Sequence, residues 1–209
     1  SSWSSKLIHG GLRYLENYEF KLVAESLRER EVITQIAPSI TKPLPFVIPH
    51  TKKLRSKLLI RLGLFLYDNL GGKTKIPKSS KVIFAEQYQN ILQSKFTEGF
   101  RYYDVQVDDK KLVEMNIDDA KKMGAIIAED TKVINANRID NYWEIMLNNN
   151  EKIKSKILIN AAGPWINETV NNVLKINAKK SIRLVRGSHI ITKKLYEEEV
   201  AFTLQNDDN

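Results

Sequence analysis

The sequence predicts an α/β fold, because helical and strand-like segments alternate along its 209 residues. Apolar residues recur every three to four positions in some segments and form short continuous runs in others. The length suffices for one large domain or two small ones with a proper core. Apolar residues make up 42% of the chain and charged residues 28%, a composition that excludes a disordered protein.

The first long segment of the fold is a helix over residues 12–37. It contains neither glycine nor proline, and Phe20, Val23 and Leu27 recur at helical spacing. Pro38 then prevents continuation, because proline lacks the backbone donor that a helix interior needs. We therefore expect one uninterrupted helix that ends before Pro38.

A strand and a second helix follow. Residues 42–49 contain prolines near both ends, which favours an extended segment at the edge of a sheet. Residues 54–70 carry leucines at helical spacing and end at the pair Gly71 and Gly72, a common stop signal. This second helix is amphipathic.

The middle of the chain predicts a strand, a helix and another strand. Residues 100–107 are strand-like, Asp108 can cap the helix that follows, and Gly124 can end it. Residues 125–135 are again rich in strand-forming residues, so the three elements form a candidate βαβ unit. Residues 143–147 and 152–160 then flank three asparagines, which predicts a hairpin.

A turn rich in small residues follows a strand that we expect to be buried, at residues 157–160. Ala161, Ala162 and Gly163 lead into Pro164, which suits the first turn of a helix. Small residues at a strand-to-helix junction let a ligand approach the backbone, and the helix start offers free N–H groups to an anion. The alternative is a plain tight turn without a ligand.

Two polar clusters lie near the ends of the chain. Residues 4–14 combine hydroxyls, a lysine, His9, the pair Gly10 and Gly11, Arg13 and Tyr14. Arg13 could grip a phosphate or carboxylate through two hydrogen bonds, and the glycines permit backbone geometry that a side chain would forbid. Residues 183–189 place two arginines and His189 around a glycine. The alternatives are a solvated loop and an ordinary strand with exposed arginines.

Taken together, these segments resemble the FAD-dependent, membrane-associated glycerol-3-phosphate dehydrogenases, within the flavoenzymes related to D-amino acid oxidase. The match rests on SSKLIHGGLRYLE at 4–16, GLFLYD at 63–68, DVQVDD at 104–109, NAAGPW at 160–165 and RGSH at 186–189. The resemblance implies oxidation of sn-glycerol 3-phosphate to dihydroxyacetone phosphate by hydride transfer to FAD. It also implies electron transfer to a membrane quinone, and possession of a D-amino acid oxidase-like FAD-binding domain interleaved with an α+β substrate-binding domain.

The resemblance assigns parts of the chain to each domain and each ligand. Residues 1–36 and 99–183 belong to the FAD-binding domain, and residues 37–98 and 184–209 to the substrate-binding domain. Ser5, Lys6, Leu7 and the stretch His9, Gly10 and Gly11 would lie along the flavin and its ribityl chain. The cofactor would also contact Val133, Ala162, Gly163 and Trp165, while Arg13, Tyr14 and His189 would face the substrate. His9 and His189 are both candidates for the catalytic base, and the sequence does not choose between them.

The sequence departs from the family pattern at its start, where no G-x-G-x-x-G turn occurs. The chain also begins with serine and ends just after an apolar segment, so we expect an internal piece of a longer enzyme. We expect that piece alone neither to retain FAD nor to turn over. For the whole enzyme, we expect peripheral association with the cytoplasmic face of the membrane and a homodimer as one option.

Composition also bears on whether the chain binds a metal, a membrane surface or nucleic acid. The chain has no cysteine and three histidines, which excludes thiolate metal sites and predicts no metal. Its net charge of +8 matches that of residues 52–81, where nine lysines and arginines accompany a single aspartate. This segment could lie on an anionic membrane surface, or its leucines could face the core with solvated lysines outside. A basic, non-enzymatic module that binds nucleic acid is a further alternative, but this charge is not interleaved with aromatic residues, so we expect no nucleic acid.

Overall fold

A computed structural model describes residues 4–51, 55–88, 91–177, 182–185 and 187–205. The chain forms two compact units. The first comprises Ser1–Asp119 and Ile191–Asn209, and the second comprises Ala120–Ile190. The helices and mixed sheet confirm the α/β class.

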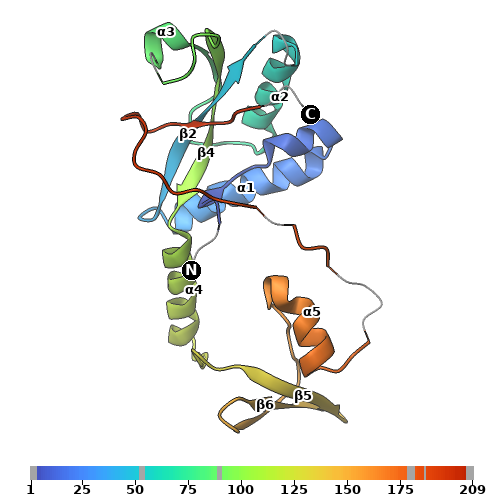
Figure 1. Ribbon diagram of the computed structural model, residues 1–209. Helices are drawn as coiled ribbons and strands as arrows, with labels where there is room; N and C mark the ends of the chain where they lie inside the picture. The colour runs from blue at the N-terminus through green and yellow to red at the C-terminus, as the bar shows by residue number, and fades with distance from the viewer. Residues whose placement is uncertain (1–3, 52–54, 89–90, 178–181, 186, 206–209) are drawn as a thin grey trace. The chain divides into compact units, whose positions relative to one another are not determined.

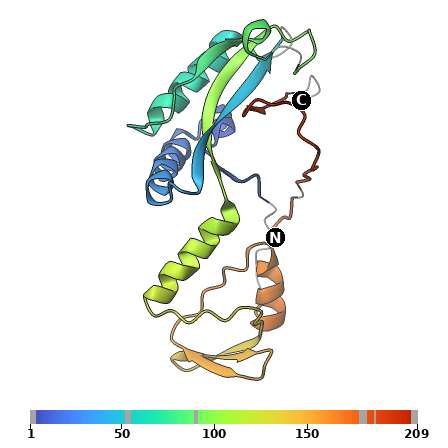
Figure 2. The ribbon, with the colours of Figure 1, turned by 90° about the vertical axis from the view of Figure 1, so that its left-hand side faces the viewer.

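The first unit is built on a five-stranded sheet in the order β1–β4–β2–β8, with β3 also paired to β4. Its strands are β1 (Leu7–Ile8), β2 (Thr41–His50), β3 (Ser80–Ile83), β4 (Glu98–Val107) and β8 (Ala201–Phe202). The antiparallel ladder between β2 and β4 runs from Thr41 opposite Val107 to His50 opposite Glu98. The long antiparallel pair of β2 and β4, the β2–β4 ribbon, runs through the unit in both views (Figures 1 and 2).

The two faces of this sheet carry separate apolar clusters. On one face, side chains from α1 (Phe20–Ile36) and α2 (Lys57–Leu70) pack against β2 and β4. Figure 2 shows both helices on the same side of the ribbon. On the other face, Val47 and Val82 pack with residues of the short helix α3 (Phe84–Gln87) and of the C-terminal segment. Because Val47 and Ile48 are neighbours on β2, the two clusters follow from strand alternation.

The proline-rich strand forms as predicted, but it does not lie at the sheet edge throughout. Its residues Phe46 and Val47 pair in parallel with β8, and the Thr203 N–H donates to the Val47 carbonyl at 2.9 Å. The three prolines occupy odd-numbered positions of the strand, as Val47 does. At these positions the main-chain N–H and C=O groups point away from β4. The missing N–H groups therefore leave the β2–β4 ladder intact.

The predicted helix over residues 12–37 is interrupted. The structure has a 3₁₀ helix, η1 (Leu12–Asn17), followed by α1, and Tyr18 between them adopts a left-handed φ of 59°. The Tyr18 N–H donates to the Leu15 carbonyl and closes the first segment. Beyond the bend, Leu12 and Leu15 still pack against the same cluster as α1.

Helix α2 ends at Leu70 as predicted but begins at Lys57, later than the predicted start at residue 54, which lies outside the described residues. The Ser56 hydroxyl caps it by accepting from the Leu59 N–H at 3.3 Å. Its buried residues are Leu64 and Tyr67. The leucines at the start of the helix do not face the core: Leu58, Leu59 and Leu62 are all more than half exposed. The apolar pattern therefore predicted the helix, but some of the leucines in that pattern face solvent.

The predicted βαβ unit is wrong. Helix α4 (Asp109–Lys122) follows β4, and Asp108 caps it as predicted, since its carboxylate accepts from the Lys111 N–H at 3.1 Å. Gly124 follows the helix with a φ of 91°. However, β4 belongs to the five-stranded sheet and β5 (Val133–Ile139) to a separate one. Each strand finds antiparallel partners of its own, so the helix does not connect two neighbours in one sheet.

The second unit contains a three-stranded antiparallel sheet of β5, β6 (Tyr142–Leu147) and β7 (Lys152–Ser155). The predicted hairpin is confirmed, with Asn150 in a left-handed turn conformation and a shorter second strand. The sheet packs against Val173 of η3 (Thr169–Val173), a π-helical turn that continues α5 (Ile166–Glu168).

The segment before these helices differs from the prediction of a buried strand. Residues 157–160 form no strand, and the side chains of Ile157 and Ile159 are 73% and 81% exposed. The Ser155 hydroxyl donates to the Ile157 carbonyl at 2.6 Å where β7 ends, and no described strand pairs beyond it. The expected helix does start after the turn, as η2 (Gly163–Trp165) with a proline in its first turn.

Within the ranges that the structure describes, no helix is long and apolar enough to cross a bilayer.

Candidate cofactor and substrate site

The residues predicted to bind cofactor and substrate fall in both units. The first unit contains Ser5, Lys6, Leu7, His9, Gly10, Gly11, Arg13 and Tyr14. The second contains Val133, Ala162, Gly163, Trp165 and His189. The arrangement within each unit is described separately.

The segment that leads into β1 is anchored to β4 and to the start of α4. The Lys6 carbonyl accepts from the Val107 N–H at 2.9 Å, and Leu7 pairs with Gln106. The Lys6 ammonium lies 3.1 Å from the carboxylate of Asp109, which also accepts from the Ser4 hydroxyl at 2.6 Å. Lys6 has a left-handed φ of 56°, so these contacts hold it in an unfavourable backbone conformation.

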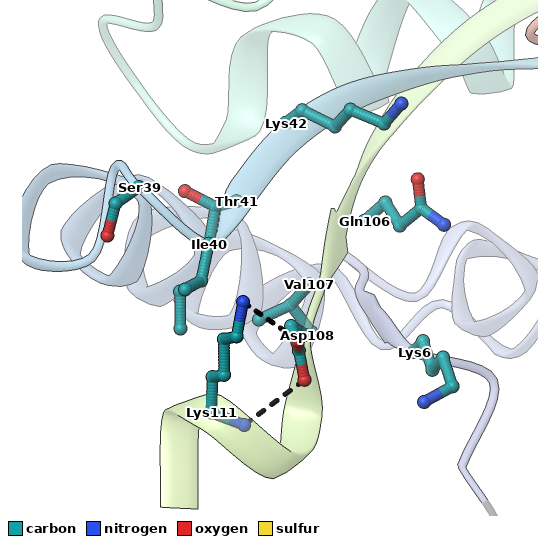
Figure 3. Close-up of a pocket in the computed structure, with 9 residues that line it drawn as sticks. All are labelled: Lys6, Ser39, Ile40, Thr41, Lys42, Gln106, Val107, Asp108 and Lys111. Atoms are coloured by element: carbon teal, nitrogen blue, oxygen red, sulfur yellow. Dashed lines mark hydrogen bonds and ion pairs between the residues drawn. The ribbon is translucent and has the colours of Figure 1, made fainter. Parts of the chain in front are cut away.

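A pocket of about 420 Å³, lined mostly by polar residues, opens beside this segment. Figure 3 shows three lysines around it: Lys6, Lys42 on β2 and Lys111 at the start of α4. Lys111 interacts with Asp108 at 3.7 Å, and Lys42 pairs with Glu199 at 3.1 Å. Because an acidic side chain accompanies each lysine, the pocket has little surplus charge for an anion.

The glycine pair lies buried at the end of β1 and has no room for side chains. A Cβ atom on Gly10 would lie 2.2 Å from Leu27 Cδ2 and 2.7 Å from the Tyr67 hydroxyl oxygen. Gly11 has a φ of 74°, and a Cβ there would lie 2.5 Å from the Tyr14 ring. Both positions thus require glycine, one for packing and one mainly for conformation.

A buried polar network holds the main chain at this point. The Gly10 N–H donates to the Tyr67 hydroxyl at 2.7 Å and contacts the Asp104 carboxylate at 3.2 Å. Tyr67 donates to the same carboxylate oxygen at 2.6 Å, and the Arg30 guanidinium donates to it at 2.9 Å. Arg30 also donates to the Tyr103 carbonyl at 3.0 Å. Elements far apart in sequence therefore converge on one carboxylate oxygen, which also accepts from the Gly10 N–H.

Burial dominates the electrostatics of this network. It raises the pKa of the Asp104 carboxyl, although the Tyr67 hydroxyl, Arg30 and the Gly10 N–H favour the charged form. Burial and the neighbouring carboxylate also raise the pKa of the Tyr67 hydroxyl. Sequence reasoning placed Tyr67 and Asp104 within family-like blocks but did not assign them roles. The available signal was an aspartate on the same strand face as the buried residues Phe100 and Tyr102.

The polar side chains that follow the glycines point to solvent. His9 and Arg13 are exposed, and Tyr14 is about half exposed. Neither His9 nor Arg13 makes a hydrogen bond or ion pair within the described residues. An imidazole, a guanidinium and a phenol thus accompany a rigidly held turn, and their polar groups are available to a small anionic ligand.

The second unit has a pocket of about 450 Å³ at the small-residue turn. Val133, Asn160, Ala162 and Trp165 all line it. The Asn160 side-chain oxygen accepts from the Ala162 N–H at 3.1 Å, while its Nδ2 is buried without a partner in the described part of the chain. Gly163 adopts a φ of 55°. Mostly apolar walls, small residues and an unsatisfied amide donor suit a nucleotide-like ligand such as the ADP half of FAD.

The predicted cluster at residues 183–189 is exposed where the structure describes it. His189 is exposed and makes no hydrogen bond in the described residues, and Arg183 is exposed as well. Arg186 lies outside the described residues. His9 and His189 belong to different units, so the choice between them as a base stays open.

Comparison with known proteins covers the whole chain. Residues 1–209 match the family described as "FAD dependent oxidoreductase". A glycerol-3-phosphate dehydrogenase of Pseudomonas aeruginosa is 47% identical over 212 residues, which cover 100% of this chain and 41% of that protein. An aerobic glycerol-3-phosphate dehydrogenase of Escherichia coli is 39% identical over 213 residues, 100% of this chain and 42% of that protein.

Two further similarities extend the picture. A D-erythritol 1-phosphate dehydrogenase of Brucella abortus is 41% identical over 214 residues, covering 100% of this chain and 43% of that protein. The solved structure of the glycerol-3-phosphate dehydrogenase from Bacillus halodurans, complexed with FAD, shares the fold with a TM-score of 0.53 at 18% identity. That likeness covers 80% of this chain and 27% of the solved one. The chain thus spans about two fifths of the length of the curated relatives it matches.

Proposed function

Because the chain belongs to the FAD-dependent oxidoreductase family, we propose that its protein oxidises a small phosphorylated polyol with FAD, and that this polyol is sn-glycerol 3-phosphate. The observation that carries the proposal is 47% identity to a glycerol-3-phosphate dehydrogenase over the whole chain. A relative named for D-erythritol 1-phosphate is 41% identical, so the substrates named for the two relatives have in common that they are phosphorylated polyols. The family match also favours an enzyme over a basic, non-enzymatic binding module.

Two groups of residues are suited to hold the cofactor. In the first unit, Ser5, Lys6 and Leu7 lead into the glycine turn at Gly10, whose main chain is held by buried hydrogen bonds. In the second unit, Val133, Ala162 and Trp165 line the pocket in which Asn160 has an unsatisfied amide donor. When bound, FAD supplies the hydride acceptor, and the protein supplies orientation and charge.

The polar side chains after the glycines are suited to the substrate. The Arg13 guanidinium can donate two parallel hydrogen bonds to the phosphate dianion, and the exposed Tyr14 hydroxyl can donate a further one. An imidazole nitrogen, of His9 or His189, can accept the proton of the substrate's C2 hydroxyl while the hydrogen bonded to C2 leaves as hydride. Arg13 thus binds and orients, and the histidine removes a proton.

We further propose a quinone as the electron acceptor and peripheral attachment of the enzyme to the cytoplasmic face of an anionic membrane. The support for membrane attachment lies in the basic segment 52–81, where Leu58, Leu59 and Leu62 expose apolar surface beside Arg61. Lysines 57 and 81 are less available, because both pair with Glu98. Flotation of the full-length protein with liposomes should depend on anionic lipid, and equal recovery without it would argue against attachment.

The test of the main proposal is anaerobic reduction of the flavin in the full-length protein. Glycerol 3-phosphate should bleach the flavin absorption band, while unphosphorylated glycerol should not. Arg13→Ala should raise the glycerol 3-phosphate concentration for half-reduction about 10- to 100-fold, since it removes charge-assisted hydrogen bonds. Arg28→Ala, at another exposed arginine, is the matched control and should change it less than about twofold.

The outcomes separate the parts of the proposal. Absence of flavin from the full-length protein would refute flavin-dependent oxidation. Flavin that is reduced by D-erythritol 1-phosphate but not by glycerol 3-phosphate would retain the reaction and reject the substrate. Equal effects of Arg13→Ala and Arg28→Ala would reject the phosphate-binding role of Arg13.

A further inference from the structure

Three distant elements and the Gly10 N–H meet at one carboxylate oxygen, Asp104 Oδ1. Tyr67 comes from α2, Asp104 from β4, and Arg30 from α1. Residues 37 to 94 positions apart in the chain are joined by hydrogen bonds of 2.6–3.2 Å around one carboxylate oxygen. All of these groups are buried. Such a set is costly to bury, and these hydrogen bonds offset much of that cost. Among the described residues, only the buried Nε of Arg30 has no partner in this network.

The network acts on backbone rather than on a side chain. Gly10 has no side chain, so its position depends on the strand before it and on the hydrogen bonds of its own N–H. Leu27 and the Tyr67 hydroxyl lie close enough to exclude even a methyl group at this position. The segment is therefore confined by packing and held by Tyr67 and Asp104.

We propose that Tyr67 and Asp104 are positioning residues that hold the His9–Gly11 main chain in the conformation that receives FAD. This inference rests on the proposed function, because it assumes that this stretch lies along the cofactor. Arg30 has a supporting role: its guanidinium neutralises the buried carboxylate and contacts the Tyr67 ring at 5.7 Å. Neither Tyr67 nor Asp104 needs to touch substrate or cofactor for this effect.

The matched pair for a test is Tyr67→Phe and Tyr102→Phe in the full-length protein. Both tyrosines belong to the same buried cluster, and their rings contact each other at 5.9 Å. Among the residues that the structure describes, the Tyr102 hydroxyl has a single hydrogen-bond contact, a long one of 3.4 Å with Thr203, and none with Gly10. Each substitution removes one hydroxyl from the same core, but only Tyr67→Phe removes a partner of the Gly10 N–H.

The readouts are the dissociation constant for FAD and the visible circular dichroism of the bound flavin, which reports on its surroundings. Tyr67→Phe should weaken FAD binding about tenfold or more and alter the dichroism spectrum, because a buried donor loses its best acceptor. Tyr102→Phe should leave both within about twofold. A purely structural role for Tyr67 would lower the stability of Tyr67→Phe but leave its FAD affinity and dichroism spectrum like those of Tyr102→Phe.

The outcomes distinguish this inference from the function on which it rests. If the unsubstituted protein holds no FAD, the proposed function fails and this inference fails with it. If it holds FAD and Tyr67→Phe leaves affinity and spectrum unchanged, only the positioning role is refuted.

A second measurement applies if Tyr67→Phe does not fold. Amide hydrogen exchange at Gly10 in the unsubstituted protein should be slow and remain slow after FAD removal. Rapid exchange would refute the positioning role. Protection that vanishes with FAD would also refute it, because the partner of the N–H would then be the cofactor.

Discussion

Replacing Gly10 by alanine should lower the free energy of unfolding by about 1–3 kcal/mol, the usual range for an overpacked core. The new methyl group would lie 2.2 Å from Leu27 Cδ2, where carbon atoms prefer about 3.5–4.0 Å. Leu27 has little freedom to retreat, because it is 1% exposed and Gly71 also lies close to it, with a Cβ built there only 2.6 Å from Leu27 Cβ. The Tyr67 hydroxyl, 2.7 Å from the same methyl position, is held by Asp104.

The assay is urea unfolding followed by far-ultraviolet circular dichroism, with Gly63→Ala as the matched control. Gly63 lies inside α2, and a Cβ there would meet nothing within 4 Å. Gly63→Ala should therefore stabilise the protein by about 0.5–1 kcal/mol through helix propensity alone. The same chemical change is thus expected to have opposite signs at two positions.

A double substitution tests the assigned cause. Leu27→Ala removes the side chain that crowds Gly10, so Gly10→Ala should cost less in that background than alone. Some cost should remain, because the contact with the Tyr67 hydroxyl persists. Equal costs in both backgrounds would refute the steric explanation, as would a Gly10→Ala variant as stable as Gly63→Ala.

Two further predictions concern charged groups. Hydrogen bonds from two lysines lower the pKa of the half-buried Glu98 carboxyl from its ordinary value of 4.5 to about 2. Its contribution to stability is therefore present above pH 4.5 and lost as the pH falls towards 2. Glu98→Gln should flatten unfolding free energy against pH in that window, and an unchanged slope would contradict this. Asp104→Ala should cost about 3–5 kcal/mol in urea unfolding because it strands the buried Arg30 charge. Lys42→Ala, which breaks an exposed ion pair, should cost at most about 1 kcal/mol; similar losses for the two would disprove this reasoning.

The buried hydrogen-bond network and the predicted site are linked through one residue. Gly10 belongs to the HGG stretch on which the family resemblance partly rests, and its N–H also donates to two members of the network, Tyr67 and Asp104. The family match confirms that resemblance. The roles of individual site residues stay predictions, and the Arg13 and Tyr67 variants address them separately.

Local features of the sequence were sufficient for several elements. The prolines and apolar residues of 42–49 predicted a strand, Asp108 predicted a helix start, and the asparagines at 148–150 predicted a hairpin turn. Pro164 likewise marked the first turn after the small-residue junction. These features depend on backbone sterics and on hydrogen bonds between near neighbours, so the sequence by itself determines them.

Tertiary structure decided which elements meet. The strand at 100–107 was recognised, whereas the strand predicted over 125–135 forms only from Val133 onward. That the two strands belong to different sheets was not predicted, because a strand's N–H and C=O groups can pair with those of any neighbouring strand. The bend at Tyr18, the exposure of Ile157 and the convergence of Tyr67 with Asp104 likewise depend on packing between distant segments. Such contacts form where burial and hydrogen bonding are satisfied together, a condition of the folded chain as a whole rather than of any one segment.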